Sequence, residues 1–290
     1  MERNWGILLA TPAILGFLLL NLGPMLFSFY IAMTDWRVGG VPTFIGLDNF
    51  IGMFTGDRLF KKSMFVTTYY TLGSVPVVIG VAFFVAILLN QKVKGLSVFR
   101  TIFYLPVLVP SVANSMLWLW IFNPDFGLMN TGLKAIGLPG LMWLYSETTA
   151  IPSLILMSSW AMGNTMIIFL AGLQGVPRHL YEAIEVDGGN AFHKLRYVTI
   201  PLMTPVIFFN LVMALINTFQ VFNEAYIMTN GGPNHATYFY VFNLFEKAFR
   251  QTEMGYASAM AVILFFVIMA VTALVFRTAK SWVYYEGEKS

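Results

Sequence analysis

The chain has 290 residues, of which 58% are hydrophobic and only 11% are charged, and its formal net charge is +3. A soluble domain normally carries roughly 25% charged residues, so this composition, with a mean hydropathy of +0.71, excludes an ordinary soluble domain. The absence of cysteine excludes disulfides and thiolate metal sites, and three scattered histidines indicate no metal centre.

Six windows without Asp, Glu, Lys or Arg follow along the chain: 7–31, 65–89, 101–122, 148–173, 199–223 and 257–276. Each reaches the ~20 residues that an α-helix needs to cross a ~30 Å hydrocarbon core. Spanning strands would be ~10 residues long with alternating polarity, and that alternation is missing. The sequence therefore predicts an all-α integral membrane protein, a single transmembrane domain over 1–290 with six spanning helices.

The first window has some features of a secretory signal peptide. Its apolar stretch is too long for the usual hydrophobic region of such a peptide, and more apolar residues follow Gly23-Pro24 in place of a cleavage site. We interpret it as a spanning helix.

Basic residues in the connections predict the orientation. If the N-terminus is cytoplasmic, ten basic residues lie on the cytoplasmic side: Arg3, Lys92, Lys94, Arg100, Arg178, Lys194, Arg196, Arg277, Lys280 and Lys289. Seven lie on the other side: Arg37, Arg58, Lys61, Lys62, Lys134, Lys247 and Arg250. The positive-inside rule favours this arrangement, and with six spans both termini are expected to be cytoplasmic.

The connection between the fourth and fifth windows, 177–198, reads as two short helices with a break. Pro177 suits a first helical position, and Leu180 and Ile184 lie one turn apart on one face. Gly188-Gly189 then supplies a stop that tolerates the left-handed conformation. On pattern alone, an interfacial helix lying on lipid remains an alternative.

The same connection carries a recognisable motif. Glu182-Ala183-Ile184, then Asp187-Gly188, then Ile200-Pro201-Leu202 resembles the "EAA" signature of binding-protein-dependent ABC importer permeases. The family form is Glu-Ala-Ala, two residues, Asp-Gly-Ala, a spacer, and an apolar residue before Pro; this chain departs from it at Ile184 and Gly189. By this resemblance, the coupling helix that docks into a cytoplasmic ATPase contains Glu182, Ala183, Ile184, Asp187 and Gly188.

Three further stretches narrow the resemblance to the carbohydrate-importer branch with maltose- and glycerol-phosphate-type systems: 100–110 with Trp118 and Asn123-Pro124, 229–237, and 256–259. They are similar to the F-like partner of the permease pair. This resemblance implies a second related permease, two ATPase subunits that bind ATP and magnesium, and an extracytoplasmic solute-binding protein, in a bacterial or archaeal cytoplasmic membrane. The chain itself has no phosphate loop, so we expect no cofactor in it and no enzymatic activity.

Polar residues within apolar spans are expensive and indicate either function or helix contacts. On the fifth predicted helix, Asn210, Asn217, Gln220 and Glu224 fall in one narrow stripe, because steps of seven and three residues nearly close full turns. On the fourth, Trp160 and Asn164 lie one turn apart. In the family the sugar site lies on these two helices, so the resemblance implies a substrate pathway formed by Trp160, Asn164, Asn217, Gln220 and Glu224. The alternative that the amides only join helices stays open.

Two other classes of function compete with this interpretation. An ion-coupled carrier generally places titratable groups within the bilayer, and here Glu147 and Glu224 lie only at the edges of windows. A membrane-embedded enzyme needs a nucleophile–base or metal constellation within the spans, and none is present. The amide-rich spans do not indicate which sugar is carried.

Overall fold

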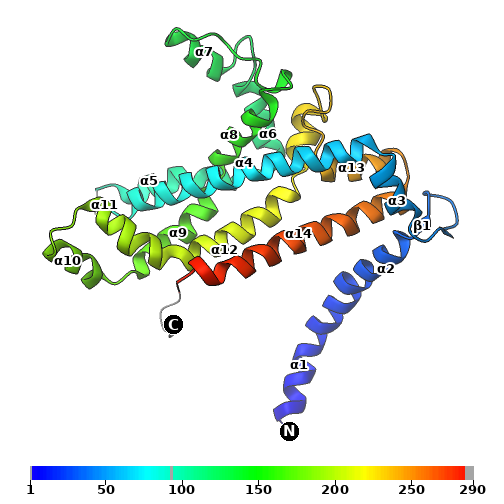
Figure 1. Cartoon of the computed structure of the whole chain (residues 1–290), viewed down its shortest axis with the longest axis horizontal. Helices are drawn as coiled ribbons and strands as arrows, with labels where there is room; N and C mark the ends of the chain where they lie inside the picture. The colour runs from blue at the N-terminus through cyan, green and yellow to red at the C-terminus, as the bar shows by residue number, and fades with distance from the viewer. Residues whose placement is uncertain (1, 92–93, 285–290) are drawn as a thin grey trace. The chain divides into compact units, whose positions relative to one another are not determined.

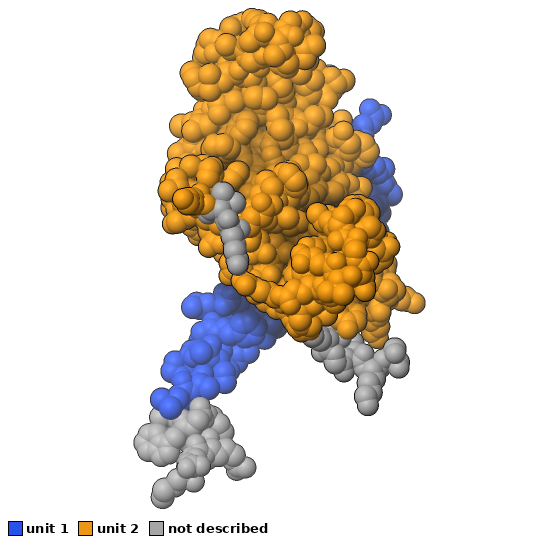
Figure 2. All heavy atoms as spheres, turned by 90° about the vertical axis from the view of Figure 1, so that its left-hand side faces the viewer, with its two compact units in different colours: residues 1–61, 243–267 blue, residues 62–242, 268–290 orange. Residues whose placement is uncertain are grey.

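The computed structural model describes residues 2–91 and 94–284, with side chains from Leu9 onward. Lys92, Lys289 and the side chain of Arg3, which were counted as cytoplasmic above, lie outside what is described. The chain divides into two compact units (Figure 2). Unit 1 contains residues 1–61 and 243–267, and unit 2 contains residues 62–242 and 268–290.

Unit 1 is built mainly from the N-terminal region. Helix α1 (Glu2–Phe17) continues through a π-helical segment (Leu18–Leu22) into α2 (Gly23–Ile31). Two antiparallel strands follow, β1 (Thr34–Asp35) and β2 (Thr43–Phe44), with Thr34 opposite Phe44, and then α3 (Asp48–Thr55). The unit also holds the start of α4 (Arg58–Leu89), the end of α13 (Tyr240–Phe245), a π-helical segment (Glu246–Arg250) and the start of α14 (Met254–Trp282).

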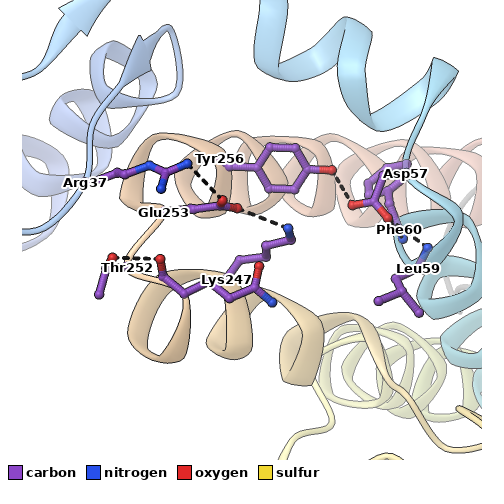
Figure 3. A network of polar contacts seen from close by, with 9 residues as sticks. Arg37, Asp57, Leu59, Phe60, Lys247, Thr252, Glu253 and Tyr256 are labelled. Carbon is purple, nitrogen blue, oxygen red and sulfur yellow. Dashed lines mark hydrogen bonds and ion pairs between the residues drawn. The ribbon is translucent and has the colours of Figure 1, made fainter.

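Within unit 1, one carboxylate ties the starts of α4 and α14 together (Figure 3). Asp57 Oδ1 accepts hydrogen bonds from the backbone N–H groups of Leu59 (2.8 Å) and Phe60 (3.0 Å), so it caps α4. Its Oδ2 accepts the hydroxyl hydrogen of Tyr256 at 2.5 Å, from the first turn of α14. The charge of Asp57 also complements the positive end of the α4 dipole.

A second carboxylate, Glu253, completes this network (Figure 3). It pairs with Arg37 at 3.3 Å and with Lys247 at 3.1 Å, and Lys247 Nζ lies 4.8 Å from the centre of the Tyr256 ring. Arg37, Asp57, Lys247, Glu253 and Tyr256 are called the polar clasp below. The clasp holds the connection after α2 against the start of α14.

Unit 2 contains the remaining helices (Figure 1): α5 (Leu96–Tyr104), α6 (Ser111–Ile121), α7 (Leu128–Ala135), α8 (Ala150–Trp160), α9 (Gly163–Gly175), α10 (Arg178–Val186), α11 (Ala191–Lys194) and α12 (Ile200–Phe219). Short 3₁₀ turns cover Leu105–Leu108 and Trp143–Tyr145, and π-helical segments cover Leu195–Thr199 and Ala225–Thr229.

Four continuous helical stretches are long and apolar enough to cross a membrane: Leu9–Ile31, Arg58–Leu89, Ala191–Phe219 and Met254–Trp282. Two bent pairs raise the number to six if each pair is one span. The pair in 96–121 bends by 102°, and α8 with α9 bends by 48°. The six predicted apolar windows are thus all helical, but 101–122 is not one continuous helix.

The bends have local causes. Val109 is extended, with ψ of 123°, because the ring of Pro110 disfavours the helical conformation at the preceding residue. At the start of α9, a Cβ on Gly163 would lie 2.7 Å from Val107 Cγ2 and 3.1 Å from Tyr104 Cα. Only glycine allows α9 to approach the end of α5 this closely.

The best-packed part of unit 2 lies where α4, α9 and α12 meet. Ala86, Phe169 and Met203 are at most 1% exposed there, and Phe83 meets Phe169 edge-on at 5.2 Å. Elsewhere the spans are poorly covered, since between 6% and 33% of the apolar window of each continuous span is buried. The rest of this apolar surface requires lipid or a partner chain to cover it.

The connection 123–149 is a folded structure organised by Asn130, which is 3% exposed. Its Nδ2 donates to the carbonyl oxygens of Pro124 (2.8 Å) and Leu141 (2.9 Å). Its Oδ1 accepts from Leu141 N (2.9 Å) and Trp143 Nε1 (2.8 Å). All four hydrogen bonds that an amide side chain can form are therefore used.

Candidate substrate pathway and coupling segment

A hollow of about 540 Å³ opens within unit 2 between α4, α5, α8, α9 and α12. Its polar lining consists of Tyr104, Ser158, Asn164, Thr165, Asn210, Asn217 and Thr218. Its apolar lining consists of Val75, Val78, Ile167, Ile168, Phe209, Met213 and Ala214. A mixed lining of this kind, with hydroxyl and amide groups but no charge, suits a neutral polar solute.

The three asparagines of the hollow differ in their environment. Asn210 is 3% exposed, and its Nδ2 donates to Val206 O of its own helix at 3.0 Å. Asn164 and Asn217 are exposed, and within the described part of the chain their amides have no hydrogen-bond partner. Their donors and acceptors are therefore available to a ligand.

Four polar residues of the hollow were missed as candidates by sequence reasoning: Tyr104, Ser158, Thr165 and Thr218. Hydroxyl groups in helices commonly bond the backbone one turn back, as Ser158 and Thr218 do to Ile155 O (2.6 Å) and Ala214 O (2.8 Å). Sequence alone therefore gives little signal for them. Tyr104 was noticed only as part of a family-like stretch.

Of the five predicted pathway residues, the structure brings Asn164 and Asn217 to the hollow but not Trp160, Gln220 or Glu224. Helix α12 ends at Phe219, so Gln220 is the capping residue beyond its C-terminus, and its Nε2 donates to Ile216 O at 3.0 Å. Glu224 lies beyond this helix end, where burial raises the pKa of its carboxyl. The predicted four-residue stripe does not extend past Asn217.

Trp160 is the last residue of α8, at the bend before α9. It is 47% exposed and meets Trp118 edge-on, with ring centres 6.1 Å apart. Because the chain bends between Trp160 and Asn164, the two side chains do not share one helical face as predicted.

The coupling segment, 177–198, forms two helices with a break as predicted. Pro177 is the capping residue before α10, one position earlier than predicted. Helix α10 ends in a Schellman motif, in which Gly188 N donates to Glu185 O (3.1 Å) and Gly189 N to Ile184 O (2.8 Å). Gly188 has a φ of +78°, which glycine adopts without strain.

The second helix of the segment begins with a capping box, in which Asn190 Oδ1 accepts from the backbone of His193 and His193 Nδ1 accepts from the backbone of Asn190. From Ala191 the chain stays helical to Phe219. Pro201, predicted to open a new span, instead lies inside this continuous helical stretch.

Helix α10 is attached to the base of this long helix. The Tyr181 hydroxyl bonds to Thr199 Oγ1 at 3.1 Å, and Glu185 forms an ion pair with Lys194. None of the residues of α10 is buried, and Glu182 and Ala183 are exposed. The segment is thus a fixed, solvent-exposed amphipathic helix.

Bent and continuous apolar spans, a polar hollow among them and an exposed amphipathic helix define a polytopic membrane permease. The family described as "Binding-protein-dependent transport system inner membrane component" matches residues 78–282, and the chain belongs to this family. It is therefore a permease component of a transport system, which confirms the predicted class and excludes the carrier and enzyme alternatives.

Relatives match along nearly the whole chain. The probable ABC transporter permease protein YesP of Bacillus subtilis (strain 168) is 41% identical over 98% of this chain and 93% of its own length. The sulfoquinovosyl glycerol transport system permease protein SmoG of Agrobacterium fabrum is 30% identical over 97% and 92%, respectively. The chain is similar throughout to permeases of ABC transporters.

The fold also matches a solved structure. A chain of the bacterial alginate ABC transporter in complex with alginate pentasaccharide-bound periplasmic protein superposes with a TM-score of 0.84, covering 96% of this chain and 95% of that one. The two sequences are 21% identical. This likeness supports the type I importer permease architecture predicted from the sequence.

Proposed function

We propose that this chain is the permease subunit of an ATP-driven importer for a sugar or oligosaccharide, which passes through the 540 Å³ hollow of unit 2. The observation that carries the proposal is the pair of exposed amides, Asn164 and Asn217, on facing helices. Amides offer both donors and acceptors to sugar hydroxyls. Relatives with starch degradation products, sulfoquinovosyl glycerol and arabinooligosaccharides in their names support the substrate class.

The complete importer, in this proposal, pairs the chain with a second related permease and two ATPase subunits, and receives its substrate from a solute-binding protein. The sparse burial of the spans favours a membrane partner. The solved alginate transporter was crystallised with a periplasmic protein that holds the pentasaccharide, which supports the solute-binding partner.

Coupling follows from the continuity of one helix. The helical stretch Ala191–Phe219 carries the attachment of α10 at one end and Asn210 and Asn217 near the other. At 1.5 Å per residue, 29 residues extend about 44 Å. ATPase closure that moves α10 would therefore move the wall of the hollow, and Glu182, Ala183, Ile184, Asp187 and Gly188 form the docking end of this lever.

The test is reconstitution of the importer with its ATPase, second permease and binding protein. We expect the tagged chain to co-isolate the ATPase, and uptake of a binding-protein-delivered sugar to stop on ATP depletion but not on addition of an ionophore. A panel of sugars in a thermal-shift assay of the binding protein identifies the substrate. Failure to co-isolate an ATPase, or uptake that an ionophore abolishes, would overturn the proposal.

A further inference from the structure

A smaller hollow, of about 370 Å³, lies at the C-terminal end of α10 on the coupling segment. It is lined by Ile184, Asp187, Gly188, Gly189, His193 and Tyr197. It is separate from the substrate hollow, with which it shares no residue. We call it the α10 socket.

Two adjacent glycines keep the socket open. A Cβ on Gly189 would lie 2.4 Å from Ile184 Cγ2 and 2.9 Å from Ile184 O. Ile184 is β-branched and stiff, and its carbonyl oxygen is held in the Schellman motif, so neither atom moves easily. The two positions at which the sequence departs from the family motif, Ile184 and Gly189, are thus in direct contact and fit one another: the larger residue at 184 requires the smaller one at 189.

The charge in the socket lacks a partner. Asp187 is the capping residue at the C-terminus of α10, where the helix dipole is negative and a carboxylate is unfavourable. Across residues 2–91 and 94–284, its carboxylate has no hydrogen bond or ion pair, since the nearby cation Lys194 pairs with Glu185. A cation placed beside Asp187 would remove this local conflict.

The wall of the socket is aromatic. The rings of His193 and Tyr197 stack with their centres 6.1 Å apart and their planes 9° from parallel. The capping box fixes His193 from the other side, and Tyr197 is 67% exposed. An aromatic face, an aliphatic floor at Ile184 and a carboxylate at the rim together fit a cation on a long aliphatic stem.

We propose that the α10 socket receives one arginine or lysine side chain of the ATPase subunit, with its stem against Ile184 and Tyr197 and its charged end at Asp187. This inference rests on the proposed function, because it requires that α10 docks on an ATPase. It adds the chemistry of the contact: Gly189 and Ile184 shape the socket, and Asp187 supplies its charge.

The experiment measures binding of the purified ATPase subunit to the permease complex in nanodiscs at several salt concentrations. Asp187→Asn keeps the side-chain shape, and we expect roughly tenfold weaker binding at low salt, with a difference that shrinks as salt rises. Gly189→Ala narrows the socket, and we expect a loss of roughly tenfold that is independent of salt. Asp125→Asn, which removes an exposed carboxylate between α6 and α7, should bind as the unchanged protein does.

A double-mutant cycle identifies the partner side chain. One arginine or lysine of the ATPase, replaced by alanine, should show a non-additive effect with Asp187→Asn and an additive effect with Asp125→Asn. Wild-type binding by both Asp187→Asn and Gly189→Ala would overturn the socket while leaving the proposed function intact. Absence of ATPase binding by the unchanged permease would instead overturn the proposed function.

Discussion

The three asparagines of the substrate hollow show that environment, and not residue type, separates a structural amide from one that can bind a solute. Asn210 is buried and bonds its own backbone, whereas Asn164 and Asn217 present unpaired amides to the hollow. The sequence placed Asn210 and Asn217 on one helical face, and both do line the hollow. It did not distinguish their roles, because a hydrogen bond to the preceding turn leaves no trace in the sequence pattern.

Asn217→Leu should lower the apparent affinity of the importer for its sugar roughly tenfold, because losing a buried hydrogen bond without replacement costs ~1–3 kcal/mol. Assembly and basal ATPase activity should be unaffected, since Asn217 bonds no described protein group. Uptake kinetics beside the yield of assembled complex check this.

Two matched variants sharpen this prediction. Asn210→Leu removes a buried side chain that bonds only its own helix, so we expect changes in stability before changes in affinity. Gln220→Leu lies beyond the end of α12 and outside the hollow, so affinity should stay normal. Normal affinity in Asn217→Leu with reduced assembly would show that this amide joins helices.

At the scale of elements, the long charge-free windows predicted every apolar helical segment, because length and hydropathy are local properties of the chain. They did not predict direction. The 102° bend in 96–121 and the 48° bend between α8 and α9 depend on what each segment packs against. Pro110 was visible as a helix breaker, but Pro201 was equally visible and lies within continuous helix, so proline alone does not decide between the two outcomes.

The coupling helix gives a direct test at this scale. Glu182→Lys should uncouple ATP hydrolysis from uptake without affecting insertion, because Glu182 is exposed on α10 and bonds no described residue. The measurement is the ratio of ATP hydrolysed to sugar transported in reconstituted vesicles. Gly188→Asp is a less clean variant, since φ of +78° at this position strains any other residue and the end of α10 would change as well. An unchanged ratio in Glu182→Lys would contradict the assignment of α10 as the coupling helix.

The polar clasp of unit 1 depends on a close approach of two backbones at Gly255. Gly255 N donates to Trp36 O at 3.0 Å, and a Cβ at this position would lie 1.9 Å from Thr34 O. Gly255→Ala should therefore lower the thermal unfolding temperature in detergent by several degrees, because relieving the overlap costs roughly 1–3 kcal/mol.

Gly80→Ala is the matched control for this variant. Gly80 lies inside α4, and an added Cβ there meets nothing within 4 Å. Alanine is the better helix former by roughly 0.5–1 kcal/mol, so this variant should be neutral or slightly stabilising. Equal behaviour of the two variants would show that the contact between Gly255 and Thr34 is not needed.

At the scale of the whole molecule, most of the apolar surface is left uncovered by the chain itself. The window of Leu9–Ile31 is 6% buried, and no continuous span exceeds 33%. A soluble protein with such exposure would aggregate, so this surface is consistent only with burial in lipid and against partner subunits. The composition predicted this outcome, because 58% hydrophobic residues exceed what the chain can bury in its own core.

Orientation in the membrane rests on a bias of ten basic residues to seven, and it decides which end of each helix meets the ATPase. With the N-terminus cytoplasmic, α10 and α11 face the cytoplasm and the connection 123–149 faces outward. The chain has no cysteine, so single cysteines report their own position without background. Glu147→Cys and Ala191→Cys are both exposed and do not interrupt the hydrogen bonds of Asn130 or of the capping box. An impermeant maleimide should label Glu147→Cys in intact cells and Ala191→Cys only after lysis. The reverse pattern would invert the topology and place α10 out of reach of any ATP-driven partner.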